Sequence, residues 1–173
     1  MTQDWIRSER LRLRPWHEDD LDVFAALTAD PQVVRYVGDG QPLDRAQTAY
    51  WLEQANRNRR RWGLGTHAII ERASDRPIGW AGLIHNDNAP APMAAEIIYA
   101  LAPDCWGRGY GSELVAALVD WAWQQRGLAS LLATVDPDNA GSIRVLQRNG
   151  FVFEQIAEEA DGAKTAYYWL GRG

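Results

Sequence analysis

The sequence contains very little cysteine and very little lysine. Cys105 is the only cysteine among the 173 residues, which excludes an internal disulfide and a zinc site built from several cysteines. Lys164 is the only lysine, so the chain has no Gly-Lys-Ser/Thr triplet and no Walker-type nucleotide site. No hydrophobic run approaches the ~20 residues of a membrane-spanning helix, and residues 1–14 lack the apolar core of a signal peptide. We therefore expect a cytoplasmic protein without a membrane partner.

The net charge and the composition narrow the class of protein further. Binding to nucleic acid relies largely on neutralising phosphates, so a net charge of −5 argues against a nucleic-acid partner. Hydrophobic and charged fractions of 46% and 24% are those of an ordinary globular protein, and we expect a single domain over residues 1–173. Nine tryptophans are many for this length. They indicate extensive aromatic packing and make a homodimer a candidate assembly.

The hydrophobic pattern predicts a mixed α/β fold, one sheet with helices on both faces. Period-two alternation and short apolar runs predict strands at residues 7–15, 66–71, 77–85, 94–103, 131–135, 151–156 and 165–170. Apolar residues at helical spacing predict helices from Leu21 to the Asp30-Pro31 stop, from the N-cap Asp44 to about Arg61, from the glycine cluster to Gly127, and from Asn139 to Asn149. Residues 32–42 are expected to be irregular.

The stretch EIIYALAPDCWGRGYGS, residues 96–112, places an apolar strand, a glycine cluster and a helix start in succession. Alternating glycines let the backbone approach a ligand closely, and the N–H groups of a helix N-terminus favour a pyrophosphate. The same glycines suit a turn that binds nothing equally well. Asn139 and Ser142 begin the next helix after the neighbouring strand, where α/β sheets bind ligands. Each also suits a plain structural role, Asn139 as an N-cap and Ser142 as a surface hydroxyl.

Several motifs, in one consistent order, resemble those of the GCN5-related N-acetyltransferases (GNATs). The run CWGRGYGSE is similar to the Q/R-x-x-G-x-G/A signature of that family. The longer AEIIYALAPDCWGRGYGSE resembles the RimJ/RimL branch of ribosomal-protein N-terminal acetyltransferases. The opening ERLRLRP, the segment DPQVVRY and the late N-x-x-S-x-R-V-L-x-x-x-G-F are also similar to that branch. The resemblance therefore covers nearly the whole chain.

The resemblance implies a GNAT fold, with a mostly antiparallel sheet in which one parallel strand pair splays apart. It also implies acetyl-CoA as co-substrate, no metal, and direct transfer of the acetyl group to a primary amine. The pantetheine arm would enter between the strand of residues 96–102 and the strand ending near Asp136, and the glycine-cluster amides would take the pyrophosphate. The residues expected to bind acetyl-CoA are Leu101, Ala102, Trp106, Gly107, Arg108, Gly109, Tyr110, Gly111, Ser112, Asn139 and Ser142.

Glu96 and Ser142 are the catalytic candidates. Glu96 is the lone carboxylate of its strand and is expected to act as the base toward the amine; the alternative is a buried structural acid paired with an arginine. Many GNATs carry a tyrosine where this chain has Leu146, and the resemblance implies that Ser142 protonates the leaving thiolate instead. The missing tyrosine supports a second hypothesis, a non-catalytic module that binds CoA or acyl-CoA in the same fold.

The acceptor amine is not identified by the sequence. In the family the segment between the first two helices, here residues 30–43, helps to form the acceptor cleft. Tyr36, Asp39 and Trp51 are therefore candidate lining residues, with core packing as the alternative for the two aromatic residues. A ribosomal-protein N-terminus, an amino acid, an antibiotic amine and a polyamine all stay candidates for the acceptor.

Overall fold

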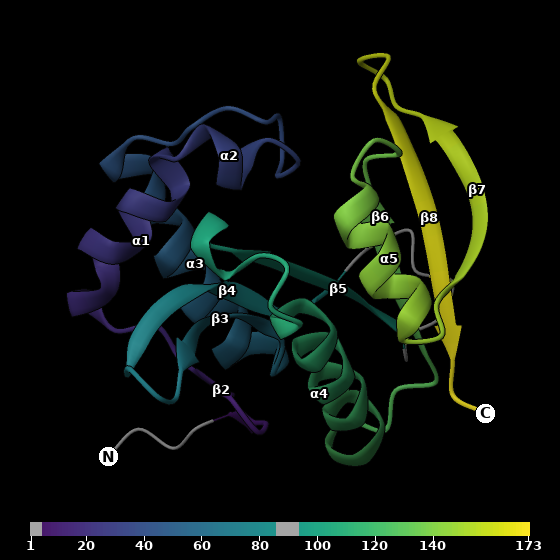
Figure 1. The fold of residues 1–173 in the computed structure, drawn as a ribbon, viewed down its shortest axis with the longest axis horizontal. Helices are drawn as coiled ribbons and strands as arrows, with labels where there is room; N and C mark the ends of the chain where they lie inside the picture. Colours follow the sequence, from purple (N-terminus) through teal and green to yellow (C-terminus); the bar gives the residue numbers. More distant parts are fainter. Residues whose placement is uncertain (1–4, 86–93) are drawn as a thin grey trace.

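The computed structural model describes residues 5–85 and 94–173. Two predictions fall partly outside the described residues. The segment 1–14, which lacks a signal-peptide core, includes the undescribed residues 1–4, and the expected single domain includes the undescribed residues 86–93. The described part forms one eight-stranded sheet with helices packed on both of its faces (Figure 1). The predicted mixed α/β class is confirmed.

The strands follow the order β1-β2-β3-β4-β5-β6-β8-β7 across the sheet. Neighbouring strands are antiparallel except for β5 and β6, which run parallel. Their bounds are β1 (Ile6–Arg7), β2 (Leu11–Arg14), β3 (Gly65–Glu71), β4 (Arg76–Ile84), β5 (Ala94–Leu101), β6 (Ser130–Val135), β7 (Val152–Glu158) and β8 (Lys164–Gly171).

The helices divide into an N-terminal group and a C-terminal pair, which cover opposite faces of the sheet (Figure 1). The first group is η1 (Glu18–Asp20), α1 (Leu21–Ala29), α2 (Pro31–Val34) and α3 (Arg45–Trp62). The second is α4 (Tyr110–Gln125) and α5 (Ala140–Arg148), with the short η2 (Pro103–Cys105) between β5 and α4. Among the described helices, none is both long and apolar enough to cross a membrane.

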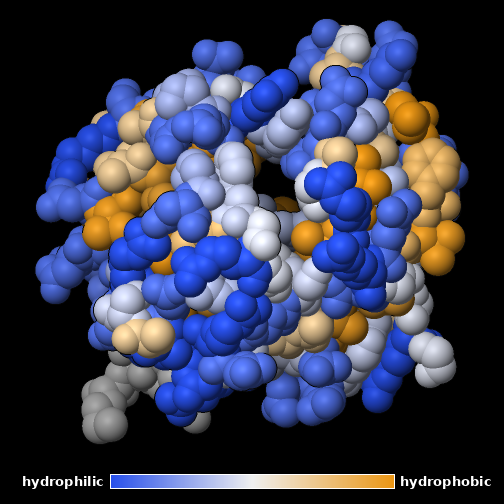
Figure 2. All heavy atoms as spheres, in the orientation of Figure 1, coloured by the Kyte–Doolittle hydropathy of each residue, from blue (hydrophilic) through white to orange (hydrophobic). Residues whose placement is uncertain are grey.

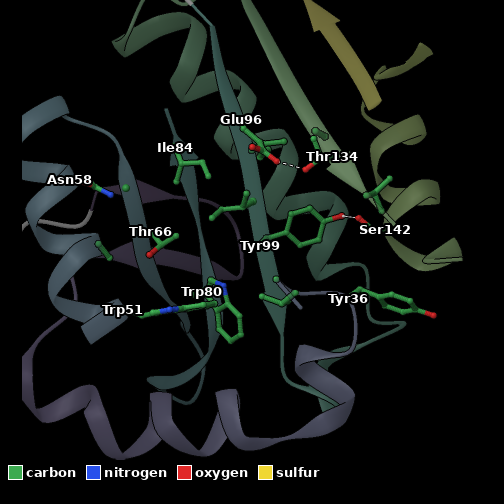
Figure 3. A pocket seen from close by; sticks show the side chains of 18 of the residues that line it. Tyr36, Trp51, Asn58, Thr66, Trp80, Ile84, Glu96, Tyr99, Thr134 and Ser142 are labelled. Carbon is green, nitrogen blue, oxygen red and sulfur yellow. Dashed lines mark hydrogen bonds between the residues drawn. The ribbon is translucent and has the colours of Figure 1, made fainter. Parts of the chain in front are cut away.

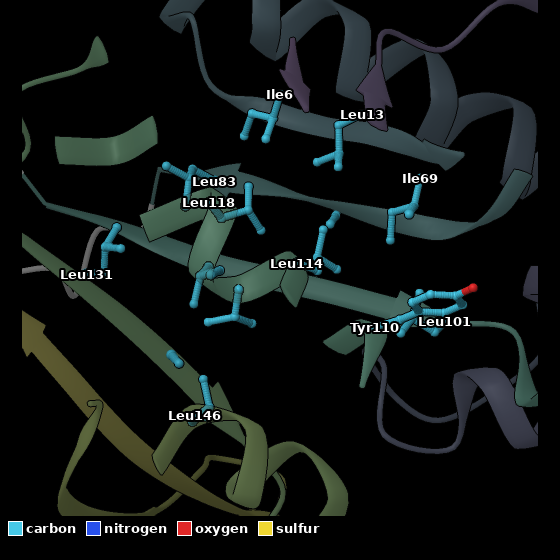
Figure 4. Close-up of a cluster of buried hydrophobic side chains, with 14 of the residues drawn as sticks. Ile6, Leu13, Ile69, Leu83, Leu101, Tyr110, Leu114, Leu118, Leu131 and Leu146 are labelled. Carbon is cyan, nitrogen blue, oxygen red and sulfur yellow. The ribbon is translucent and has the colours of Figure 1, made fainter. Parts of the chain in front are cut away.

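Each face of the sheet carries its own hydrophobic cluster. Successive residues of a strand point to opposite faces, so Ile69 of β3 joins the cluster built around α4, while its neighbour Ile70 joins the cluster built around α1 and α3. Figure 4 shows Leu114 and Leu118 of α4 pointing into the first cluster, close to Leu83 of β4. The two clusters fix the helices on the sheet, and with them the loops that follow β5 and β6.

The predicted strand at residues 7–15 is wrong in its bounds. The structure divides it into β1, which ends at Arg7, and β2, which begins at Leu11, and the two pair as a tight antiparallel hairpin. The Ser8 N–H donates to the Leu11 carbonyl at 2.9 Å and closes the turn between them. Period-two alternation holds only within β2, so the pattern located that strand correctly but extended it through the turn.

The irregular segment predicted over residues 32–42 contains part of a short helix, α2. Asp30 accepts the N–H of Gln32 and Pro31 occupies the first helical turn, so the dipeptide that ends α1 also begins α2. The prediction for α3 is confirmed. Asp44 is its N-cap and forms a capping box with Gln47, whose side chain accepts the Asp44 N–H.

The outer strand β7 leaves apolar side chains in solvent. Val152 is 67% exposed, Ile156 52% and Phe153 49%, and Figure 2 shows hydrophobic residues gathered over this edge of the molecule. An exposed apolar edge is compatible with association of two copies. The homodimer indicated by the tryptophan content stays a prediction.

His67 of β3 is a fully buried titratable group. Its ring stacks on Trp5 with 3.7 Å between ring centroids, and its Nδ1 lies 3.1 Å from the Gly65 carbonyl oxygen. Its Nε2 has no hydrogen-bond partner among the residues that the structure describes. Burial, with a smaller contribution from the charge of Arg59, lowers the pKa of His67 from its usual 6.5 to about 3.

We predict that the free energy of unfolding decreases as the pH drops below 6.5. Because the pKa of His67 is lower in the folded state, the unfolded chain takes up this proton first between pH 6.5 and about 3, and the loss reaches about 1.4 kcal/mol per pH unit. Urea unfolding across this range should show a shallower slope for His67→Phe, which keeps the stacked ring. The exposed His85 changed to Gln is the control. Equal slopes for His67→Phe and wild type would contradict the prediction.

Candidate active site

The parallel strands β5 and β6 separate along their length. They pair only from Ala94 with Ser130 to Glu96 with Leu132, whereas β5 continues to Leu101 and β6 to Val135. Beyond the last paired residues the two strands diverge toward their carboxyl ends, so a V-shaped gap opens inside the sheet. The splayed parallel pair expected for this fold is confirmed.

Backbone groups of β5 line one side of this gap. The Ala102 N–H donates to the Ile78 carbonyl at 2.8 Å, and in an antiparallel pair the groups that face the partner alternate along the strand. Ala102 therefore commits its N–H to β4, while Tyr99 and Leu101 turn their N–H groups toward β6. The indole Nε1 of Trp106 donates to the Leu101 carbonyl at 2.8 Å and ties the following loop to the strand.

The glycine cluster leads directly into α4. Gly107 and Gly109 have φ angles of 70° and 79°, which only glycine adopts without strain, and Gly109 is the N-cap of the helix. The N–H groups of the first helical turn have no partner within a helix, and the helix dipole adds positive potential at this end. The residues predicted as an anion site therefore lie in a loop and at the start of a 16-residue helix.

Side chains of the glycine cluster anchor this loop to β3. Tyr110 is buried, and its hydroxyl donates to Glu71 at 2.6 Å. The guanidinium carbons of Arg10 and Arg108 lie over its ring, at 4.4 and 4.8 Å from the ring centroid. Hydrogen bonds from Ser74 and then Tyr110 lower the pKa of Glu71, which keeps it an ionised acceptor. Only the backbone of Tyr110 is therefore directed to a ligand at the helix N-terminus.

The start of α5 follows β6 and lies at the gap. Asn139 caps the helix, because its Oδ1 accepts the Ser142 N–H at 3.1 Å, and both residues also line the cavity described below. Ser142 Oγ lies 2.8 Å from the hydroxyl of Tyr99 on β5 (Figure 3). Leu146, at the position where many GNATs carry a tyrosine, is 1% exposed and packs in the core.

Tyr99 is the site residue that sequence reasoning missed. It lies on β5 between the two positions considered there, and its hydroxyl is a polar group at the gap. Burial raises the pKa of Tyr99 above its usual value, and the bond to Ser142 opposes this only in part. Tyr99 therefore keeps its proton at neutral pH. The signal that could have identified it is its position, a tyrosine three residues after Glu96 in a strand whose other residues are apolar.

Glu96 lies where β5 and β6 begin to separate. It is 7% exposed, and its carboxylate accepts a hydrogen bond from the hydroxyl of Thr134 on β6 (Figure 3). The carboxylate is thus held at the vertex of the gap, beside the cavity, by a partner from the opposite strand. This placement is compatible with both roles considered for Glu96, the base and the structural acid.

A cavity of about 510 Å³ extends from the gap to α1, the segment after α2, and α3. Figure 2 shows it as the hollow near the centre of the molecule. Glu96, Thr134, Tyr99 and Ser142 line it on the strand side, and aromatic residues line it on the helix side (Figure 3). The candidates Tyr36 and Trp51 are among the lining residues, whereas the candidate Asp39 is not.

Tyr36 connects the two sides of this cavity. Its hydroxyl lies 3.5 Å from the carbonyl oxygen of Asp138, which precedes α5. The segment after α2 therefore reaches the loop that precedes α5. Within residues 5–85 and 94–173, no group of three or more His, Cys, Asp or Glu side chains is placed to hold a metal ion.

Comparison with known proteins assigns this arrangement to a family. Residues 10–152 match the family model described as "Acetyltransferase (GNAT) domain". The chain is 30% identical over 161 residues to the "Uncharacterized N-acetyltransferase p20" of Bacillus licheniformis, which covers 92% of this chain and 88% of that protein.

Solved structures of acetyltransferases have the same fold as this chain. An acetyltransferase from Agrobacterium tumefaciens superposes with a TM-score of 0.80 and 29% identity, over 96% of this chain and 94% of that one. The RimJ protein of Mycobacterium smegmatis, solved with a CoA disulfide, superposes with a TM-score of 0.80 and 19% identity, over 99% and 90% of the two chains. The chain belongs to the GNAT family of acetyltransferases and is an acyltransferase whose structural neighbours include RimJ.

Proposed function

We propose that the protein transfers an acetyl group from acetyl-CoA directly to a primary amine, at the point where β5 and β6 separate. The observation that carries this proposal is one continuous cavity that reaches the gap between the strands, the Glu96 carboxylate and the Tyr99–Ser142 pair. A cofactor arm and an acceptor can meet there with an acid and a base within reach.

The described residues fit acetyl-CoA in shape and in chemistry. An extended pantetheine arm suits the gap, because the N–H groups of Tyr99 and Leu101 face it as they would face a neighbouring strand. The amides of residues 107–112 at the start of α4 suit the pyrophosphate. Asn139 uses its Oδ1 as the helix cap, which directs its NH₂ group to the amide carbonyls of the arm.

In this proposal Glu96 accepts a proton from the acceptor ammonium, which exposes the nitrogen lone pair. The neutral nitrogen attacks the thioester carbonyl carbon, a C–N bond forms, and the C–S bond breaks as the tetrahedral intermediate collapses. Ser142 donates a proton to the departing sulfur and takes one from the Tyr99 hydroxyl, which stands in for the tyrosine absent at Leu146. The second proton of the acylated nitrogen passes to water, and water returns a proton to the Tyr99 oxygen, so the net proton released is the one taken up by Glu96. The products are the acetylated amine and the free thiol of CoA.

The non-catalytic module is the competing hypothesis. The feature that favours it is Leu146, which removes the usual acid of the family from its position. The Tyr99–Ser142 pair, from β5 and from the start of α5, supplies hydroxyl groups to the same cavity. For that reason we favour catalysis over simple binding.

The glycine cluster gives a test of cofactor binding. Gly109 and Gly162 have similar positive φ angles of 79° and 84°, so alanine strains the backbone equally at both, but only Gly109 lies at the start of α4. In Gly109→Ala the free loop relaxes out of this conformation and binding must restore it, so we predict about tenfold weaker acetyl-CoA binding, the effect of roughly 1.4 kcal/mol. Gly162→Ala should leave binding unchanged. Calorimetry measures both. Failure of the wild-type protein to bind acetyl-CoA would overturn the proposed function.

The Tyr99–Ser142 pair gives a test of the acid. We predict that Ser142→Ala and Tyr99→Phe each lower kcat on the order of a hundredfold. The kcat of the double variant should be only slightly below that of the less active single variant, because the two hydroxyls act as one unit. Thiol release under saturating acetyl-CoA measures kcat. Unchanged kcat in both single variants would remove the pair from the mechanism, and independent, multiplying losses would show two separate roles.

Glu96 is tested in the same thiol-release assay with a panel of primary amines. Glu96→Gln keeps the size of the side chain and a hydrogen-bond acceptor for Thr134, but it cannot take up a proton at neutral pH. We predict a fall in kcat on the order of a hundredfold, with acetyl-CoA affinity unchanged. Thr134→Val, which leaves the carboxylate in place, should cost far less. If Glu96→Gln matches wild type, Glu96 is a structural acid.

A further inference from the structure

The helix side of the cavity is lined mainly by aromatic rings. Trp51 and Tyr50 from α3 are 38% and 60% exposed, although both line the cavity. Tyr36 borders it from the segment after α2, and the buried Trp80 of β4 lies beside Trp51 (Figure 3). Large exposed aromatic surfaces that line a cavity are typical of sites that bind an apolar or aromatic ligand.

The charge of the lining is one-sided. Among the described residues that line the cavity, Glu96 is the one carboxylate and none is a lysine, arginine or histidine. The other polar groups near the aromatic rings, Gln54 and Asn58 of α3 and Thr66 of β3, are neutral. An ammonium entering this space is attracted by the Glu96 carboxylate, whereas a second carboxylate would lose its hydration without a cationic partner.

The arginines of this region lie outside the cavity. Arg57 pairs with Glu53 at 3.0 Å, and Arg45 pairs with Asp22. Arg35 is exposed and stacks on Tyr36, with 5.1 Å between its guanidinium carbon and the ring centroid. Because Tyr36 lines the cavity, Arg35 is an alternative partner for an acceptor carboxylate, and it needs a direct test.

We propose that the acceptor is a small arylalkylamine, a primary amine on an uncharged aromatic body with no carboxylate beside the amine. This inference rests on the proposed function and names its substrate class. The ring packs against Trp51 and its aromatic neighbours, and the ammonium points to Glu96 at the vertex of the gap. A cavity of about 510 Å³ has room for a molecule of this size beside a thin cofactor arm.

Three matched acceptors test the charge requirement. Phenethylamine, L-phenylalaninamide and L-phenylalanine share the phenyl ring and the primary amine, but differ in carrying no substituent, a neutral amide or a carboxylate next to the amine. We expect kcat/KM for L-phenylalanine to be at least about tenfold below that for each of the other two, the discrimination typical of an unpaired buried group. Spermidine and butylamine, which lack the ring, should also fall at least about tenfold below phenethylamine.

Variants of α3 test the aromatic and the charge arguments separately. Trp51→Ala should raise KM for phenethylamine about tenfold without changing KM for acetyl-CoA. Trp62→Ala, on the same helix but outside the cavity lining, should change neither. Gln54→Arg adds a cation to the wall and should raise kcat/KM for L-phenylalanine relative to phenethylamine about tenfold. Arg35→Ala should leave that ratio unchanged.

The outcomes separate the two levels of the proposal. If L-phenylalanine, spermidine or butylamine equals or exceeds phenethylamine, the acceptor class is wrong although acetyl transfer stands. A selective loss of L-phenylalanine turnover in Arg35→Ala would also overturn it, by showing a cationic partner for the carboxylate. If acetyl-CoA binds but no amine is acetylated, including peptides with free N-termini, the proposed function fails and this inference fails with it.

Discussion

The site depends on β5 keeping its pairing with β4 while it gives up β6. The register with β4 runs from Ile84–Glu96 to Gly79–Leu101, and β6 stays paired with β8 along its whole length. Glycine assists on the β4 side, since a Cβ at Gly79 would lie 2.1 Å from the Ala100 carbonyl oxygen. β5 therefore stays with β4 and β6 stays with β8, and the gap between β5 and β6 results from this strand pairing.

This divergence explains how Glu96 and Tyr99 serve the same cavity. The two residues are three apart on one strand, so their side chains point to opposite faces. In a continuous sheet the backbone would separate them. Because the sheet is open beyond Glu96, a single cavity reaches the carboxylate on one side and the Tyr99–Ser142 pair on the other. The gap thus holds a proposed base and a proposed acid apart, yet within one space.

Local chemistry made part of this structure predictable. The capping box at Asp44 and the glycine cluster before α4 are written in neighbouring residues, and the family resemblance added the splayed strands. The Tyr99–Ser142 contact joins residues 43 positions apart, so its existence depends on tertiary packing. Backbone groups near Leu101 and Ala102 were expected to hold the cofactor arm, and strand register decides which of them face the gap: the Ala102 N–H donates to Ile78 instead. The absence of cationic side chains from the described cavity lining likewise depends on tertiary structure, because arginines lie next to the lining residues in the sequence of α3.

The convergence of β5 and β6 also sets a depth limit. An extended chain entering from the carboxyl ends of the strands has backbone partners on both sides, but it can advance only until the strands close at Glu96 and Leu132. The inserted chain is held at the start of α4, and the closure of the strands sets how far its other end can extend. A chain shorter than the distance from the start of α4 to Glu96 would not bring its reactive end to the Glu96 carboxylate. The sheet therefore selects the length of the inserted chain without contacting its terminal group.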